Sequence, residues 1–147
     1  MKRIIILTAF ILFPLLVAAQ VSPETLAKRA KRKNLTVREF NTDSRGKSEW
    51  LDHLTVYDDQ GRKIEEIEYA TYGQVERVTT AYDETTGKVS VEVVYNDRNK
   101  PVRIRKYEYN PDGTKKKQYN YLPNGKLYSI KVFSYTFSDA SAKNGGD

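Results

Sequence analysis

Turn-forming residues recur at nearly constant spacing through most of the chain. Glycine or asparagine occurs at intervals of 12, 14, 12, 14 and 12 residues, at Gly61, Gly73, Gly87, Asn99, Gly113 and Gly125. These two residue types accept positive φ in tight hairpin turns, so each position predicts a chain reversal. The runs between them alternate apolar and polar residues, as in KVSVEVVY (88–95), which is typical of strands. We therefore expect an all-β fold, an antiparallel meander of about seven strands between Glu49 and Phe137.

The alternation of 12 and 14 residues defines a two-strand repeat of 26 residues. Three copies follow one another, at Tyr57–Tyr82, Asp83–Glu108 and Tyr109–Ser134. When the copies are superimposed, Tyr69, Tyr95 and Tyr121 coincide. Repeats of about 20 to 50 residues are typical of arrays in which each unit packs on its neighbours. The sequence therefore predicts a sheet built from repeated hairpins.

Apolar residues change face midway along several strands, for example from Ile64 to Ile67 and from Val75 to Val78. Successive side chains of a strand point to opposite faces, so one regular half-buried strand would not give this pattern. Either β-bulges occur at equivalent places, or strong twist lets each face bury a different half of the strand. We favour a long, highly twisted meander. The pattern leaves open whether the sheet is open, closed or single-layered.

The first 19 residues have the organisation of a signal peptide. A positive start, MKR, precedes the apolar run of residues 4–19, and Val17 and Ala19 fit a cleavage site before Gln20. The alternative is a membrane anchor, but the run is shorter than the roughly 20 residues that a bilayer requires, and Pro14 interrupts it. We expect an exported protein, periplasmic or secreted, with no stable membrane span after removal of this segment.

Two further segments flank the predicted sheet. Residues 20–48 are expected to form a short helix and a linker, because Ser22 can cap a helix, Pro23 suits its first position and Glu24 its first turn. Residues 41–49 have the composition of a turn or loop. The predicted domain of 49–137 is followed by a polar tail, 138–147, which is expected to be disordered.

Composition excludes several functional classes. The chain contains no cysteine, so it has no disulfide, no cysteine-based metal site or nucleophile, and no cysteine for a lipid anchor. Basic residues cluster at 28–33 and 115–117, but an exported chain seldom meets nucleic acid, and we expect none as a partner. These clusters are interpreted as solvated basic faces.

No residue set predicts catalysis, a metal site or a cofactor. The single histidine, His53, lies next to Asp52, and neighbours on a strand point to opposite faces. Glu66 and Glu68 share a strand face and in principle suit glycoside hydrolysis, but charged residues on the wet side of a strand explain them more simply. An enzyme therefore remains a third and minor alternative.

The tyrosines are the candidate site. Five of them stand four residues before a turn residue: Tyr57, Tyr69, Tyr95, Tyr109 and Tyr121. Because successive turns lie at opposite ends of a meander, these tyrosines form two rows, one at each end. Flat aromatic rings beside lysine and arginine suit a glycan or a peptide strand. The alternative interpretation is that each ring covers its hairpin and packs across strands.

The segments YDDQGRK (57–63), YDETTGKV (82–89) and YNPDGTK (109–115) resemble the YD-repeat family of secreted and cell-surface bacterial proteins. YLPNGKL (121–127) and YGQV (72–75) resemble the hairpins of MORN-like repeats. The resemblance implies an exported β-meander or wrapped sheet without a cofactor. The second segment carries an inserted residue and asparagine replaces aspartate at Asn110. In large YD-repeat proteins the array forms a shell around a toxin, for which three units are too few.

Together these features predict an exported, non-enzymatic binding module of the cell envelope or extracellular space. It would recognise a glycan, a peptide or a protein surface through its tyrosine-rich sheet. The alternative is an inhibitor or immunity protein that blocks a secreted toxin through a sheet face or edge. The sequence does not identify the partner.

Overall fold

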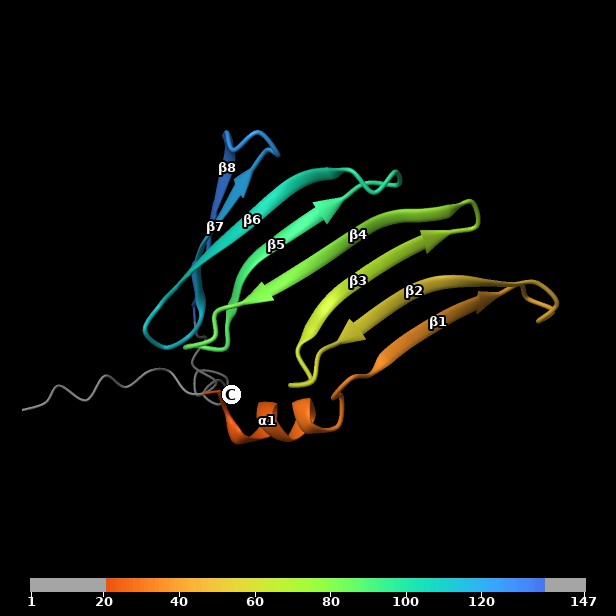
Figure 1. The fold of residues 1–147 in the computed structure, drawn as a ribbon, viewed down its shortest axis with the longest axis horizontal. Helices are drawn as coiled ribbons and strands as arrows, with labels where there is room; N and C mark the ends of the chain where they lie inside the picture. Colours follow the sequence, from red (N-terminus) through yellow and green to blue (C-terminus); the bar gives the residue numbers. More distant parts are fainter. Residues whose placement is uncertain (1–20, 137–147) are drawn as a thin grey trace, which may run out of the picture.

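The computed structural model describes residues 21–136, and within them the chain forms one antiparallel sheet preceded by one helix (Figure 1). The strands are hydrogen-bonded in sequence order, so the sheet is an uninterrupted meander. Helix α1 spans Pro23–Ala30. The strands are β1 (Thr36–Thr42), β2 (Glu49–Tyr57), β3 (Lys63–Ala70), β4 (Gly73–Tyr82), β5 (Val89–Tyr95), β6 (Pro101–Tyr109), β7 (Lys115–Tyr121) and β8 (Leu127–Val132). The signal peptide and the tail predicted from the sequence lie outside the described residues.

All six predicted reversals are turns with positive φ, from 58° at Asn99 to 124° at Gly73. The strand count differs from the expected seven, because the segment assigned to the linker contains β1. Its hairpin turns at Gly46, with φ of 66°, which lies outside the spacing of 12 and 14 residues. The repeat pattern therefore gave no indication of β1, although an antiparallel all-β meander after a short helix is confirmed.

A β-bulge occurs in every strand pair, and six of the seven lie directly before a tyrosine at the end of a strand. Val56 pairs with Glu65 and Tyr57 with Lys63, which leaves Ile64 as the extra residue of β3. An extra residue of this kind moves the following side chains to the other face. Regularly placed β-bulges, the first of the two explanations, are therefore present and account for the change of face along the strands.

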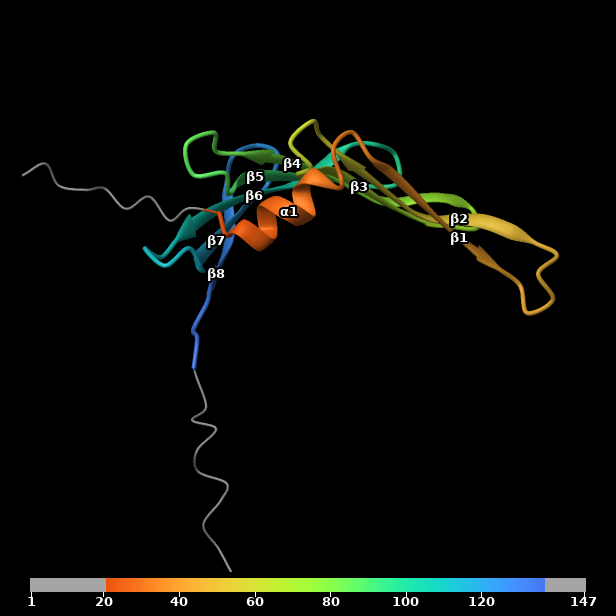
Figure 2. The same cartoon turned by 90° about the horizontal axis from the view of Figure 1, so that it is seen from below.

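The sheet is open and single-layered within the described residues, and it bends into an arch (Figure 2). Among residues 21–136 no second sheet or helix covers either face, so the buried core is very small. Ile67 and Val94 are the only buried apolar side chains among the described residues, with 9% and 3% of their surface exposed. The strands are held together by their ladders and by half-buried side chains of neighbouring strands.

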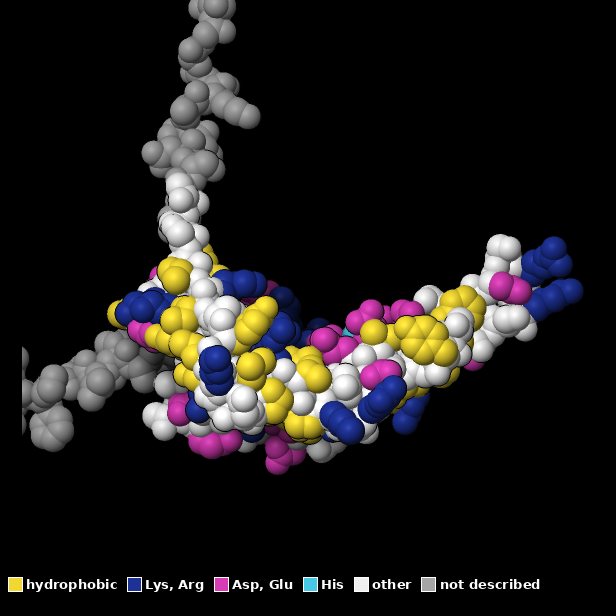
Figure 3. Space-filling view, turned by 90° about the horizontal axis from the view of Figure 1, so that it is seen from above, with side chains coloured by type: hydrophobic (Ala, Val, Ile, Leu, Met, Phe, Trp, Pro, Cys, Tyr) yellow, Lys and Arg dark blue, Asp and Glu magenta, His cyan; other side chains and the backbone are white. Residues whose placement is uncertain are grey.

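The two faces of the arch differ. Strand alternation places Thr55, Val94 and Asn120, three of the four buried side chains among the described residues, on one face. Bending crowds side chains on the inner side of a sheet, and Figure 3 shows charged side chains gathered in the hollow. We call the face of these three residues the hollow face and the opposite face the outer face.

Helix α1 lies across the ends of the strands, below the β2–β3 and β4–β5 turns (Figure 1). It begins as predicted: the Ser22 side chain accepts a hydrogen bond from the Thr25 N–H, and Pro23 occupies the first turn. The helix approaches the sheet closely at Gly61, where a Cβ atom would stand 1.9 Å from the Arg29 carbonyl oxygen. No helix among residues 21–136 is long and apolar enough to cross a membrane.

Candidate functional site

The residue that follows the strand-end tyrosine builds the turn. Asp58 accepts hydrogen bonds through Oδ1 from the N–H groups of Gln60 and Arg62, at 2.9 and 2.8 Å. Its Oδ2 accepts a third from Arg62 Nε at 2.7 Å. Partial burial opposes ionisation of Asp58, but these hydrogen bonds outweigh it and hold the pKa of Asp58 below its usual range. Asp58 therefore acts in the turn and is not a free acid.

Asparagine replaces aspartate in the same role. Asn96 Oδ1 accepts from the N–H groups of Arg98 and Lys100, both at 3.0 Å. The backbone pattern is also shared, since Asp58 N–H donates to the Arg62 carbonyl and Asn96 N–H to the Lys100 carbonyl. In these two turns the short carbonyl side chain after tyrosine accepts the turn N–H groups, and aspartate and asparagine serve alike. In the β6–β7 turn the Thr114 N–H donates instead to Asp112. The role that Asp58 and Asn96 share gives the Tyr-Asp pattern a structural explanation.

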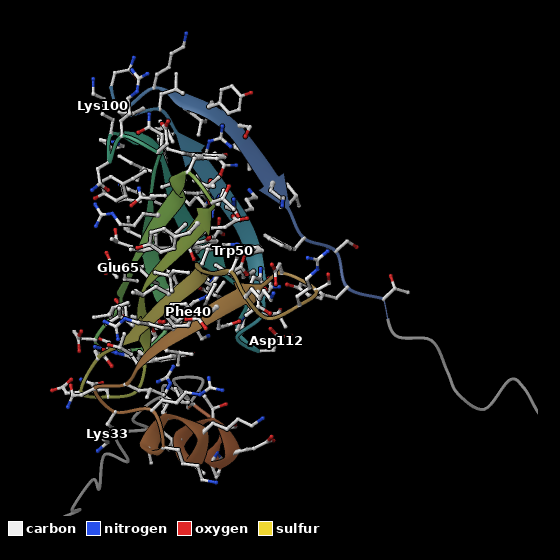
Figure 4. The ribbon with its side chains drawn as sticks, turned by 90° about the vertical axis from the view of Figure 1, so that its right-hand side faces the viewer. Lys33, Phe40, Trp50, Glu65, Lys100 and Asp112 are labelled. Atoms are coloured by element: carbon white, nitrogen blue, oxygen red, sulfur yellow. The ribbon has the colours of Figure 1, made fainter. Side chains whose placement is uncertain are left out.

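The structure separates the five candidate tyrosines into two groups, at opposite ends of the strands and on opposite faces. Alternation places Tyr57 and Tyr109 on the hollow face, at the end near α1. It places Tyr69, Tyr95 and Tyr121 on the outer face, at the other end. In Figure 4, Lys33 beside α1 and Lys100 in the β5–β6 turn mark these two ends. The five rings do not form one surface.

Tyr82 completes the hollow-face group, which we call the hollow row: Tyr57, Tyr82 and Tyr109. Tyr82 ends β4 and pairs with Val89, as Tyr109 ends β6 and pairs with Lys115. The sequence interpretation left Tyr82 out because the inserted residue in its turn puts it five positions before Gly87. The signal that identifies it is the Tyr-Asp pair itself.

Two hydroxyl groups of the hollow row are tied to the sheet. Tyr82 donates to the Lys63 carbonyl at 2.9 Å, and Tyr109 donates to the Val89 carbonyl at 2.8 Å. Burial raises the pKa of both phenols above the ordinary value, to about 12 for Tyr109. The Tyr57 hydroxyl makes no hydrogen bond to any residue among 21–136. It is therefore the available phenol of the row.

A basic side chain lies over each ring of the hollow row. The distances from cation to ring centre are 5.4 Å for Arg32 over Tyr57, 4.9 Å for Arg62 over Tyr82 and 5.1 Å for Lys88 over Tyr109. Such contacts hold the cation beside the ring. The hollow row thus presents basic groups that lie on aromatic rings. This combination suits an acidic or polar partner.

Two of the three outer-face rings, Tyr95 and Tyr121, also lie beneath a cation. Arg77 lies 4.0 Å from the ring centre of Tyr95 and also donates to Glu65 Oε1 at 2.9 Å. Lys106 lies 5.6 Å from the ring centre of Tyr121. Because the Arg77 charge is paired with Glu65, the cation beside Tyr95 is less available than Arg32 and Lys88 of the hollow row. Arg62 of the hollow row is paired in the same way, with Asp58. Figure 4 shows Glu65 in the middle of the sheet.

Two hollows adjoin the hollow row. One, of about 410 Å³, is lined by Lys88, Val89, Tyr107 and Tyr109 among others. The other, of about 320 Å³, lies between α1 and the β2–β3 turn and contains Tyr57 and Tyr82. In the first, burial together with a 2.5 Å hydrogen bond from Tyr107 to Glu92 raises the pKa of Tyr107 far above its ordinary range. The tyrosines thus line shallow, open sites.

His53 lies half-buried on β2 and pairs with Glu66 across the sheet, with 2.9 Å between Nε2 and Oε1. Lys63 contacts the other oxygen of Glu66 at 2.6 Å. Burial would raise the pKa of Glu66, but the hydrogen bonds from Lys63 and His53 lower it overall. Glu66 is therefore a charged partner and not a proton donor. Sequence reasoning missed this pair, since it depends on the register between β2 and β3.

The hollow beside His53 has a volume of about 240 Å³ and is also lined by Glu68, Glu76 and Val78. Within the described part of the chain, no group of three His, Asp or Glu side chains is arranged to hold a metal ion. The arrangement forms cross-strand ion pairs, and its electrostatics match the charged lining of the hollow face.

Comparison with known proteins finds no matching family model and no matching curated protein. Among solved structures, the GtfA/B complex bound to UDP and GlcNAc matches 65% of this chain and 19% of its own, with 15% identity and a TM-score of 0.30. A mutant of S. aureus TarM, in complex with Fondaparinux, alpha-GlcNAc-glycerol and UDP, matches 76% of this chain and 22% of its own, with 18% identity and a TM-score of 0.28. The chain thus corresponds to about a fifth of these proteins. At these TM-scores the likeness carries no argument about function.

Proposed function

We propose that the protein is an exported, non-enzymatic binding module that holds a glycan, a peptide or a protein surface against the hollow face of its sheet. The observation that supports this most is the hollow row, in which three ordered tyrosine rings each lie beneath a cation on an uncovered face. A face without a covering layer is open to a large partner, and aromatic rings with basic groups are common in recognition surfaces.

The positive charge of the hollow row limits the chemical class of the partner that we propose. Since the rings lie under arginine and lysine, a ligand meets cations first and aromatic edges second. Acidic or strongly polar groups on a glycan, or acidic side chains of a peptide, complement such a surface. An apolar ligand does not.

The test is a binding screen against arrays of immobilised glycans and peptides, followed by interferometry with two matched double variants. We expect Tyr57→Ser with Tyr109→Ser, on the hollow row, to weaken binding about tenfold or more. The control, Tyr69→Ser with Tyr121→Ser, removes two strand-end rings from the outer face and should bind like the wild type. Circular dichroism checks that both variants keep their sheet. An array without any binder, or equal losses in both variants, would contradict the proposal.

The second candidate, an inhibitor of a secreted toxin, is favoured by the exposed edge strand β8. β8 pairs only with β7 among the described strands. It exposes four large apolar residues, by 44 to 68% of their surface: Leu127, Tyr128, Ile130 and Val132. An unpaired strand edge of this kind can extend the sheet of a partner. In this case Ile130→Pro, and not the hollow-row variant, would abolish binding of the partner.

A further inference from the structure

The hollow between α1 and the β2–β3 turn is rich in positive charge. Of the nine residues that line it, five are basic and none is acidic: Thr25, Lys28, Arg29, Arg32, Tyr57, Gly61, Arg62, Lys63 and Tyr82. They come from α1 and the segment that follows it, from the β2–β3 turn, from the ends of β2 and β4 and from the start of β3. The tertiary fold therefore gathers cations from segments that are distant in sequence.

Some of these charges are already paired. Lys28 contacts Glu24 at 2.6 Å, Arg62 contacts Asp58 at 2.7 Å and Lys63 contacts Glu66 at 2.6 Å. These three cations are balanced by carboxylates that stand outside the hollow. They contribute donors to its wall but little net charge.

Arg29 and Arg32 are different, since neither forms an ion pair with a carboxylate among residues 21–136. Arg29 donates from Nη2 to the Gly87 carbonyl at 3.3 Å, which leaves its other donors free. Arg32 lies over the Tyr57 ring, whose hydroxyl has no described partner. Two guanidinium groups and a phenol that have no ion-pair or hydroxyl partner among residues 21–136 thus face one hollow.

The backbone that carries these groups is fixed to the sheet. The Arg32 N–H donates to the Arg29 carbonyl at 2.9 Å, and the Asn34 N–H donates to the Asp58 carbonyl at 2.8 Å. The Arg29 carbonyl also stands directly over Gly61. A site whose donors are held in place loses little entropy when a ligand binds.

We propose that this hollow is a binding site for a tetrahedral oxyanion, a phosphate or sulfate group carried by a larger molecule. The planar guanidinium presents paired N–H donors that match two oxygens of such a group, and two guanidinium groups balance its two negative charges. A volume of about 320 Å³ accommodates the group together with part of the molecule that bears it. The inference goes beyond the proposed function, because it assigns a chemical group and a place that binding along the hollow row does not require.

The first test follows ¹⁵N–¹H spectra of the protein while inorganic phosphate, and separately sulfate, is added at constant ionic strength. We expect saturable shifts at Arg29, Arg32, Gly61 and Gly87 and none at the distant turn of Gly125. Equal shifts with chloride, or shifts spread over all basic surfaces, would show general screening and overturn the site.

Variants make the test specific. Arg29→Gln with Arg32→Gln should lower the affinity for phosphate about tenfold or more, because two charge-assisted contacts are lost. Arg29→Lys with Arg32→Lys keeps the charge and removes the planar fork, and should lose most of this affinity as well. The control, Lys126→Gln with Lys131→Gln, removes the same charge at the opposite edge and should bind phosphate normally. An unchanged affinity in the arginine-to-glutamine variant would overturn the inference.

The source of the anion is distinguished by two further probes. Vesicles with an anionic phospholipid test a lipid headgroup, and a soluble sugar phosphate tests a glycan. Binding of either that depends on Arg29 and Arg32 supports the site and identifies its ligand class, while binding of neither limits the affinity to the free anion and argues against a carried group. If phosphate shifts the signals of this site but no glycan or peptide on the arrays binds the protein, the anion site is supported and the proposed function is contradicted.

Discussion

At the scale of single residues, the tyrosine and the residue after it have separate tasks. The tyrosine lies half-buried at the end of its strand beside a bulge, and the aspartate or asparagine after it accepts the N–H groups of the turn. Each buried or turn-bound N–H needs such a partner. The recurrence of this pair along the chain therefore reflects the need to build many similar hairpins.

Substitutions of Asp58 test whether the residue after the tyrosine stabilises the turn. We expect Asp58→Ala to lower the free energy of unfolding by about 1–2 kcal/mol, because two turn N–H groups and Arg62 lose their acceptor. Asp58→Asn should cost about half of that, since asparagine makes the same backbone contacts at Asn96. Urea unfolding measures both. Asp59→Asn, a change in an exposed neighbour, is the control and should have no effect.

The lowered pKa of Asp58 also predicts how the stability of the protein depends on pH. The folded pKa of Asp58 lies below the unfolded value, so its contribution is complete above the unfolded pKa of about 3.9 and is lost as the pH falls through the folded pKa. Wild-type stability should therefore decrease on acidification below about pH 5 more steeply than that of Asp58→Asn. Parallel acid profiles would contradict this account.

At the scale of elements, bulges and close approaches decide how the repeated hairpins fit together. A bulge before each strand-end tyrosine changes the face of the side chains that follow, and so it sends the two tyrosine groups to opposite faces. Helix α1 joins the sheet through turns and not through strands, with the Arg29 carbonyl over Gly61. The attachment of α1 thus depends on one residue without a side chain.

Gly46 and Gly61 have similar backbone conformations, so substituting each of them separates the cost of backbone strain from the cost of a steric contact. Gly46 has φ of +66° with nothing near its missing Cβ, while Gly61 has φ of +71° with the Arg29 carbonyl in the way. Gly46→Ala should cost about 1 kcal/mol from the left-handed backbone alone. Gly61→Ala should cost a further 1–3 kcal/mol or so and release α1. Hydrogen exchange at Asn34 and Tyr57, whose N–H groups bond across this junction, should rise only in Gly61→Ala. Equal effects would refute the close contact.

At the scale of the whole molecule, stability is distributed along a line of strands. Among the described elements each strand contacts only its neighbouring strands in sequence, and the buried apolar core of the described residues consists of Ile67 and Val94. In such arrays stability is close to a sum over units and their interfaces, with weaker ends than middle. The sheet thus resembles a repeat protein more than a globule with a central core.

Truncation tests this distribution. A chain that ends at Leu122 lacks β8, which among the described strands contacts only β7. We expect it to keep its sheet by circular dichroism and to unfold at a lower urea concentration, as a shorter array does. Hydrogen exchange in the wild type should be slowest in β4 and β5 and faster toward both edges. Complete loss of the sheet on truncation would indicate one cooperative core.

The sequence alone determined the antiparallel meander, its six regular turns, the capped helix and the two rows of tyrosines, because turn residues, strand alternation and caps act over a few residues. It missed β1, whose turn at Gly46 lies outside the repeat spacing, and it left the shape of the sheet open. Only the tertiary structure decided that the sheet is an open arch, that the two rows face opposite ways, and that Arg29 and Arg32 lie beside Tyr57. These features depend on bulge geometry, register and the packing of α1, which join residues distant in the chain and leave no local pattern.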